Sequence, residues 1–295
     1  MSDVIVRRLK LGRTSVRELV RLSETGIQGY RNDKLPHHIE RADYLFRWGC
    51  TDNLPIDARV VVNKSEAIHK VNNKLRFRQI MDEAHLCPAT WVNSREVQYP
   101  AVVRPHVHAQ GRRLFVVNNE GELRHAAGLV GGQWYASPLI AKTAEYRVFV
   151  VQGRVVCVAK KYPGNPNDVA WNVARGGRFE NVHWDEWPLK ACKIALQAFV
   201  LSGLDFGGVD VMIGRRASYV GNRAIPVPNA EEETLVLEIN SAPSLTSPYR
   251  QKCFARAFDY ITQNGKEVIP LQAERGNYRK FIHPAVVQVQ AGARG

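Results

Sequence analysis

Hydrophobic and polar residues alternate along several short stretches near the start of the chain, as they do in strands with one buried face. Strands are predicted at residues 3–9, 43–48 and 59–63. Between the first two, Ser15 and Glu18 have capping-box spacing and predict the start of a short amphipathic helix. This order of elements predicts a small α/β unit over residues 1–65.

The rest of the chain mixes helical periodicity with further alternating stretches. Helices are predicted at 72–86, ending before Pro88, at 121–127, at 188–202 and at 248–262. Strands are predicted at 89–92, 99–104, 113–117, 133–140, 145–151, 154–160, 206–213 and 235–240. The pair 145–151 and 154–160 has the spacing of a hairpin. Residues 162–183 are rich in Pro, Gly and Asn and predict a long loop, and 214–231 predict a polar excursion.

One apolar strand carries two unexpected polar residues. In LVLEINSAPSL, residues 235–245, Glu238 and Asn240 are two positions apart and therefore share one face of the strand. A buried, unpaired carboxylate is costly, so a base, a ligand or a metal ion should neutralise it.

A second apolar strand, FGGVDVMI, also holds a single acid, Asp210. If the two strands form an antiparallel pair, Asp210, Glu238 and Asn240 share a face. Three oxygen ligands, two of them anionic, suit Mg²⁺. An ordinary hydrogen-bonded sheet face is the alternative interpretation.

Basic residues recur on the neighbouring predicted strands. Arg104 ends YPAVVRP, Lys142 follows 133–140, Arg147 lies in EYRVFVV, and Lys160 ends its partner strand. Basic side chains are rarely buried unless they are paired, so several on one sheet indicate a bound polyanion.

Composition narrows the class of protein. The 295 residues include 41 Lys and Arg against 28 Asp and Glu, a formal charge of +13, which favours anionic partners. The basic residues are dispersed, so nucleic acid is not the favoured partner. No apolar run is long enough to span a bilayer, and no secretory signal is evident, so a membrane partner is not expected. The five cysteines form no CxxC and are interpreted as reduced thiols of a cytoplasmic protein.

The ordered set of segments resembles the ATP-grasp superfamily, especially its branch of ribosomal-protein glutamate ligase-like enzymes, over about residues 60–262. The segments are VVNKSEAIHKVNNKLRFRQIMDEAHLCPATW, YPAVVRP, HVHAQGRR, WYASPLI, EYRVFV, NVARGG, GVDVMI and LEIN. The short N-terminal region with RWG at 47–49 is similar to abbreviated forms encoded by bacteriophages. The chain departs from the family pattern at Arg104, where lysine is usual, and at Arg112, where a second glycine is usual.

This resemblance implies a fold of the α+β or α/β class, the ATP-grasp fold. A nucleotide would lie between two subdomains containing antiparallel sheets, next to the N-terminal α/β unit. The implied ATP-grasp domain covers 66–270, with a small subdomain at about 88–140 and a large one at about 141–262. Residues 271–295 form a C-terminal tail, of which 283–295 are expected to be frayed.

The resemblance further implies a ligase that depends on ATP and Mg²⁺, with Mn²⁺ as an alternative ion. It would join a small-molecule or peptide carboxylate to an amine through an acylphosphate, releasing ADP and phosphate. The implied metal ligands are Asp210, Glu238 and Asn240. The implied nucleotide contacts are Lys74, Arg104, Gln110, Gly111, Ser137, Leu139, Lys142 and Lys160. Arg147, Arg175 and Asn172 would stabilise the transferring phosphoryl group and the acylphosphate.

Two other functions remain open on the sequence. The chain could be an ATP-grasp scaffold that binds nucleotide or nucleic acid without ligation, which the +13 charge and the departures at Arg104 and Arg112 favour. It could also be a kinase on the same fold. The expected setting is the cytoplasm of a bacterium or of a phage-infected cell, and a homodimer is the oligomer considered.

Overall fold

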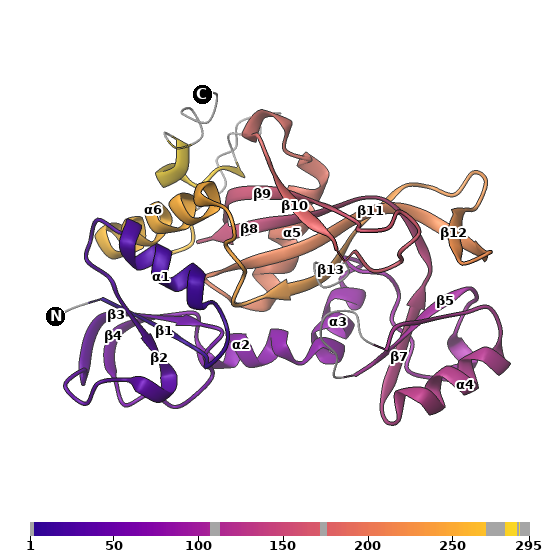
Figure 1. Cartoon of the computed structure of the whole chain (residues 1–295), viewed down its shortest axis with the longest axis horizontal. Helices are drawn as coiled ribbons and strands as arrows, with labels where there is room; N and C mark the ends of the chain where they lie inside the picture. Colours follow the sequence, from indigo (N-terminus) through magenta and orange to yellow (C-terminus); the bar gives the residue numbers. More distant parts are fainter. Residues whose placement is uncertain (1–2, 107–112, 172–175, 270–280, 288, 290–295) are drawn as a thin grey trace.

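The computed structural model describes residues 3–106, 113–171, 176–269, 281–287 and 289. Its strands form three sheets. In Figure 1 the N-terminal sheet lies at the lower left, and the other two lie above it and to its right. Helices α2 (Ser65–Asn72) and α3 (Lys74–Glu83) run from the N-terminal sheet towards the other two. This arrangement brings segments from most of the chain to one place.

The N-terminal sheet is parallel, with strand order β2-β1-β3-β4. Its strands are β1 (Val4–Arg7), β2 (Gln28–Arg31), β3 (Arg41–Trp48) and β4 (Asp57–Val62), and α1 (Arg13–Leu22) follows β1. The predicted capping box is wrong, because α1 begins earlier, after Gly12. Ser15 lies inside the helix, where its hydroxyl accepts a hydrogen bond from the Leu245 N–H at 2.9 Å. Strand β2 was not predicted.

A small antiparallel sheet with strand order β6-β5-β7 follows α3. It consists of β5 (Ala101–Pro105), β6 (Phe115–Val117) and β7 (Trp134–Pro138), and α4 (Glu120–Val130) packs on it. The strand predicted at 89–92 is reduced to one isolated bridge, between Trp91 and Ala136. Helix α2 was also not predicted.

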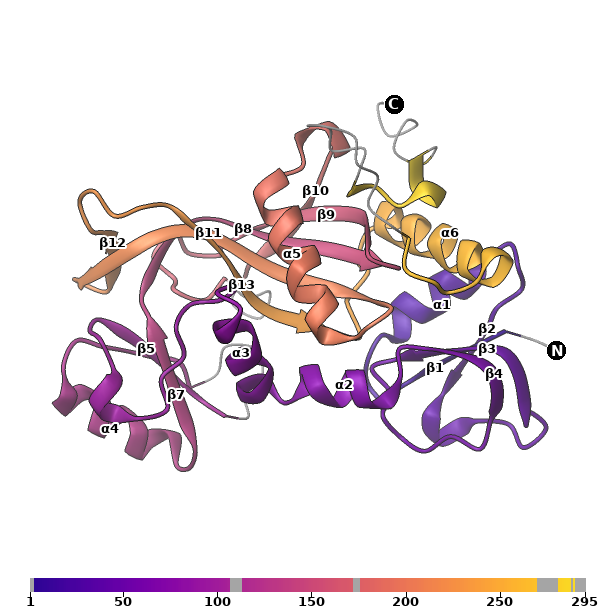
Figure 2. The ribbon, with the colours of Figure 1, turned by 180° about the vertical axis from the view of Figure 1, so that it is seen from behind.

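The largest sheet provides the scaffold of the site. It consists of β8 (Ile140–Val151), β9 (Arg154–Tyr162), β10 (Arg178–Val182), β11 (Phe206–Val220), β12 (Arg223–Pro226) and β13 (Glu233–Asn240). The predicted β8–β9 hairpin and the antiparallel pairing of β11 with β13 are confirmed. Strand β10 lies in the segment predicted as a loop, and the polar excursion holds the end of β11 and β12. Helix α5 (Leu189–Ser202) covers one face (Figure 2).

One continuous core joins the N-terminal and largest sheets. Trp48 of β3 stacks on Phe206 of β11 at 5.2 Å between ring centroids, and Phe258 of α6 (Pro248–Asn264) packs on Phe46 at 4.5 Å. The N-terminal unit is therefore held by apolar packing as well as by chain connection.

The C-terminal segment belongs to the same core. Phe281, Ile282 and His283 are buried, and Ile282 forms a parallel bridge with Val155. The expectation that residues 283–295 are frayed is wrong for 283–287, because His283 and Val286 are buried and Val286 packs in the core. In the parts of the chain that the structure describes, no helix combines the length and the apolar character needed to cross a membrane.

Candidate functional site

A cavity lies between the small and the largest sheets, and Lys74, Phe77 and Arg78 of α3 contribute to its lining. Together with the solvent at its opening, the space between atoms amounts to about 1130 Å³. Its charged lining residues are Lys74, Arg78, Arg104, Lys142, Glu145, Lys161, Asp210 and Glu238. Five of these are basic and three are acidic, so the cavity favours an anionic ligand.

An apolar part of the lining faces the same space. Val102 and Leu114 contribute from the side of the small sheet, and Met212 and Leu237 from the largest sheet. An elongated ligand with an apolar ring at one end and negative charge at the other would match both parts of the cavity.

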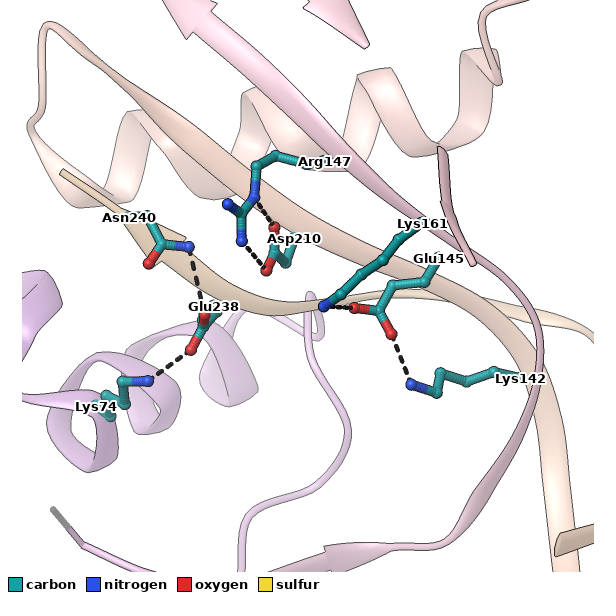
Figure 3. Close-up of polar contacts among 8 residues, drawn as sticks. All are labelled: Lys74, Lys142, Glu145, Arg147, Lys161, Asp210, Glu238 and Asn240. Carbon is teal, nitrogen blue, oxygen red and sulfur yellow. Dashed lines mark hydrogen bonds and ion pairs between the residues drawn. The ribbon is translucent and has the colours of Figure 1, made fainter. Parts of the chain in front are cut away.

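Asp210, which lines the cavity, forms an ion pair with Arg147, which is not among the lining residues. The two residues face each other across β11 and β8, and Arg147 Nε and Nη2 donate to the two Asp210 carboxylate oxygens at 2.5 and 2.7 Å (Figure 3). The side chains are 13% and 4% exposed. Burial would lower the pKa of Arg147, but the Asp210 charge raises it above its ordinary value.

Glu238 has a different cationic partner. Lys74 of α3 donates to Glu238 Oε2 at 2.6 Å, and the Asn240 amide donates to Glu238 Oε1 at 3.3 Å (Figure 3). The predicted antiparallel pairing of the two strands is confirmed, and its register puts Glu238 opposite Asp210. Burial would raise the pKa of Glu238, but Lys74 and then Arg147 lower it to about 2. The carboxylate is therefore ionised at neutral pH.

A third charged group occupies the adjoining wall. Glu145 of β8 accepts hydrogen bonds from Lys142 and Lys161, each at 2.6 Å (Figure 3). Burial would raise the pKa of Glu145, but the two ammonium charges lower it. Burial lowers the pKa of Lys142, and Glu145 opposes that shift. The three side chains together carry one net positive charge.

A match to a known protein family shows which family this chain belongs to. The model of the RimK-like ATP-grasp domain matches residues 87–252, more than half of the chain. The chain belongs to the RimK-like ATP-grasp family. No curated protein sequence matches it.

Solved structures show the same ATP-grasp fold at low sequence identity. The ATP-grasp ligase PsnB, in complex with a precursor variant, Mg and ADP, is 13% identical, with a TM-score of 0.59 over 89% of this chain and 98% of that chain. D-alanine–D-alanine ligase from Bacillus anthracis with ATP is 12% identical, with a TM-score of 0.55 over 91% and 96%. The macrocyclase MdnC from Microcystis aeruginosa is 14% identical, with a TM-score of 0.57 over 88% and 99%.

The oxygen donors of this ATP-grasp site fit a magnesium ion. Asp210 and Glu238 supply carboxylates, and Asn240 supplies a carboxamide, all from two neighbouring strands. No three His, Cys, Asp or Glu side chains gather within the described residues to hold an ion. Bound phosphate or water would therefore complete the coordination. Lys74 and Arg147 already neutralise the two carboxylates, so a metal ion would compete with these cations.

The structure brings most of the described predicted nucleotide contacts to the cavity. Lys74, Arg104, Ser137 and Lys142 line it. Burial lowers the pKa of Arg104, an effect that the nearby Tyr135 opposes. Gln110, Gly111, Asn172 and Arg175 lie outside the described residues.

Two predicted contacts are not among the lining residues. The backbone groups of Leu139 are hydrogen-bonded to other parts of the chain. Its N–H donates to the Pro100 carbonyl, and its carbonyl accepts from the Ala217 N–H, both at 3.1 Å. Lys160 lies on the other face of β9 from its neighbour Lys161, with its ammonium 5.1 Å from the centre of the Tyr162 ring. Strand alternation thus places Lys161 rather than Lys160 at the site.

Sequence reasoning also missed two aromatic side chains and one acid of the site. Lys142 lies 4.7 Å from the centre of the Trp171 ring, and Arg147 lies 4.9 Å from that of Phe179. Both rings lie in the segment predicted as a loop, where isolated aromatic residues among polar ones were the available signal. For Glu145, the available signal was its place two positions before Arg147, which puts both side chains on one face of the strand.

Proposed function

We propose that this ATP-grasp protein is an ATP- and Mg²⁺-dependent ligase that joins a carboxylate to an amine. The observation that supports it is the cavity between the two sheets, which combines an apolar wall with five basic and three acidic side chains. The apolar wall suits a purine ring. The excess of basic groups complements the charge that nucleotide phosphates retain beside a divalent ion.

The proposed reaction has two displacements. A carboxylate oxygen of the first substrate attacks the γ-phosphorus of ATP, the bond to the bridging oxygen breaks, and ADP leaves with that electron pair. The amine nitrogen of the second substrate then attacks the acyl carbon, and phosphate leaves with the electrons of the C–O bond. The nitrogen loses a proton, so the products are an amide, ADP and phosphate.

The residues act by positioning and by charge neutralisation. Lys74, Arg104, Lys142 and Lys161 line the cavity and are assigned to the phosphates of ATP. Asp210, Glu238 and Asn240 would hold Mg²⁺, which supplies neutralisation of the phosphate oxygens when bound. Arg147, fixed by Asp210, is assigned to the transferring phosphoryl group. Arg175 and Asn172 are kept as proposals from the sequence.

The substrates are proposed from the chemistry of the fold. Among the similar structures, PsnB and MdnC are each in complex with a precursor peptide, and a Chryseobacterium gregarium ligase is in complex with a leader and core peptide. We therefore favour a carboxylate of a peptide or an amino acid. The five cysteines are free and buried, which agrees with a cytoplasmic setting.

The test is turnover of Mg·ATP with pooled carboxylates and amines, with ADP and phosphate measured separately. We expect equal release of ADP and phosphate, stimulated by one carboxylate–amine pair. ADP without phosphate would instead identify a kinase. Nucleotide binding without turnover in every pool would support the binding module, which the neutralised metal carboxylates also favour.

The control variants for this test are Asp210→Asn and Glu238→Gln, which keep the size of each side chain. Both should lose turnover while circular dichroism shows a folded protein. Unchanged turnover in both would contradict the metal assignment.

A further inference from the structure

Glu145 has no role in the reaction described above, although it is one of the most buried acids of the site. We propose that Glu145 is a positioning residue that fixes the ammonium groups of Lys142 and Lys161 towards the phosphates of the bound nucleotide. This inference rests on the proposed function, because it assigns those phosphates to the cavity.

The geometry joins three residues from two strands. Lys142 precedes Glu145 by three positions on β8, and Lys161 is directly opposite Glu145 on β9. One lysine donates to each carboxylate oxygen, both at 2.6 Å. A single carboxylate therefore sets the positions of two ammonium groups that reach it from different directions.

Burial makes this carboxylate necessary. The Lys142 and Lys161 side chains are each 7% exposed, and Glu145 is 2% exposed. Two ammonium groups held together away from water would repel each other and lose hydration without compensation. Glu145 removes both problems while leaving one net positive charge for a ligand.

The aromatic neighbours limit the remaining freedom of the two lysines. The Lys142 ammonium is 4.7 Å from the centre of the Trp171 ring, and the Lys161 ammonium is 5.6 Å from that of Phe179. An ammonium has three N–H donors, of which Glu145 takes one from each lysine. All three charged residues line the cavity, so donors remain for phosphate oxygens.

The direction in which Glu145→Gln changes nucleotide affinity distinguishes a positioning role of Glu145 from a purely electrostatic effect of its charge. Glu145→Gln removes a negative charge from a cavity that binds a polyanion, which by charge alone would tighten nucleotide binding. If Glu145 positions the two lysines, binding weakens in spite of the added positive charge.

The experiment measures the affinity of the full chain for methylanthraniloyl-labelled ADP with Mg²⁺. We expect the Kd of Glu145→Gln to rise about tenfold or more, the usual consequence of losing charge-assisted hydrogen bonds. Glu145→Asp, which keeps the charge, should restore part of the affinity. The matched control is Glu180→Gln, since Glu180 is exposed, pairs with Arg178 and is opposite Lys160 on the other face of the sheet. An equal or lower Kd in Glu145→Gln would overturn the proposal.

A second readout needs no nucleotide. Acetic anhydride labelling followed by peptide mass spectrometry reports how reactive each lysine is. Without Glu145 the ammonium form is less stable, so Lys142 and Lys161 should be acylated several-fold faster in Glu145→Gln than in the wild type. Unchanged labelling rates in Glu145→Gln would overturn the positioning role of Glu145. Failure of the wild type to bind nucleotide would instead refute the proposed function, and the labelling result would still test Glu145. If Glu145→Gln does not fold, the Kd and the labelling rates of Glu145→Asp test the positioning role of Glu145 instead.

Discussion

Arg147 and Asp210 show how single residues determine the site. A guanidinium and a carboxylate that are 13% and 4% exposed lose most of their hydration, and each is tolerated because the other is present. Gly208, two positions before Asp210, leaves the space that this pair needs. A Cβ at Gly208 would lie 3.3 Å from Cδ of Arg147.

At the scale of residues, the contribution of the Asp210–Arg147 pair to stability can be measured separately from its contribution to turnover. Asp210→Ala should lower the free energy of unfolding by about 3 kcal/mol, because it leaves Arg147 buried without a partner. The double variant Asp210→Ala with Arg147→Met removes both charges and should recover most of that loss. Urea denaturation of the wild type, both single variants and the double variant gives the coupling energy.

Turnover of Mg·ATP should be absent from the double variant despite its recovered stability, because both assigned groups are missing. A double variant as unstable as Asp210→Ala would show that the ion pair is not the source of the loss.

Residue patterns predicted two acids of this site, Asp210 and Glu238, but not which cations pair with them. Glu238 and Asn240 stood out because they interrupt an apolar strand, and their shared face follows from alternation alone. Lys74 reaches Glu238 from a helix 164 positions earlier in the chain, and Arg147 reaches Asp210 across 63 positions. Such pairings depend on how elements pack, which local patterns do not encode.

At the scale of elements, the pairing of β8, β9 and β10 determines which side chains face the cavity. Glu145, Lys161 and Phe179 are in register across the three strands and share a face, whereas Tyr146, Lys160 and Glu180 share the other. Lys160 rather than Lys161 was predicted in the site because the sequence does not specify the register of the β8–β9 hairpin near its open end. Strand β10 was missed because its Pro- and Gly-rich surroundings indicate a loop.

Adjacent lysines on β9 therefore allow a matched comparison. Lys161→Met should raise the Kd for Mg·ADP about tenfold, because it removes an ammonium from the cavity wall. Lys160→Met removes the same charge from the same strand but on the other face, so its Kd should stay within about twofold of the wild type. Isothermal titration calorimetry on the three proteins measures both effects. Equal losses in the two variants would mean that net charge, rather than strand register, determines affinity.

For the whole molecule, the three sheets and their order along the chain were largely predictable, since hydrophobic periodicity and the ordered motifs specify them. The docking of the C-terminal segment was not. Gln152, at the β8–β9 turn, donates to the carbonyls of Gly265 and Glu267, both at 2.9 Å, and accepts from Ile269 N–H at 3.0 Å. Hydrogen bonds between a tight turn and a distant segment leave no periodic signal in either.

His283 completes this attachment and makes it sensitive to acid. It is 0% exposed, and its Nε2 lies 3.1 Å from the Gln152 carboxamide oxygen, while its Nδ1 accepts from Ala285 N–H at 3.2 Å. Gln152 can only accept at that oxygen, so the ring is neutral with its proton on Nε2. Burial, and then the charge of Arg154, lower the pKa of His283 to about 3.

The stability contributed by neutral His283 follows from this shift. A histidine whose folded pKa lies below its unfolded value of 6.5 contributes fully above that value, and the contribution is lost as the pH falls from about 6.5 towards 3. At pH 5 the loss should reach about 2 kcal/mol of unfolding free energy. Urea denaturation at pH 7 and pH 5 measures it.

The matched comparison uses two histidines of this chain that differ in burial. His283→Gln should be less stable than the wild type at pH 7 but should lose about 2 kcal/mol less between pH 7 and pH 5, because the titrating group is gone. His37→Gln alters an exposed residue and should keep the acid sensitivity of the wild type. If His283→Gln and the wild type lose the same stability on acidification, the acid sensitivity arises elsewhere, and the C-terminal segment is held by its apolar contacts rather than by a neutral histidine.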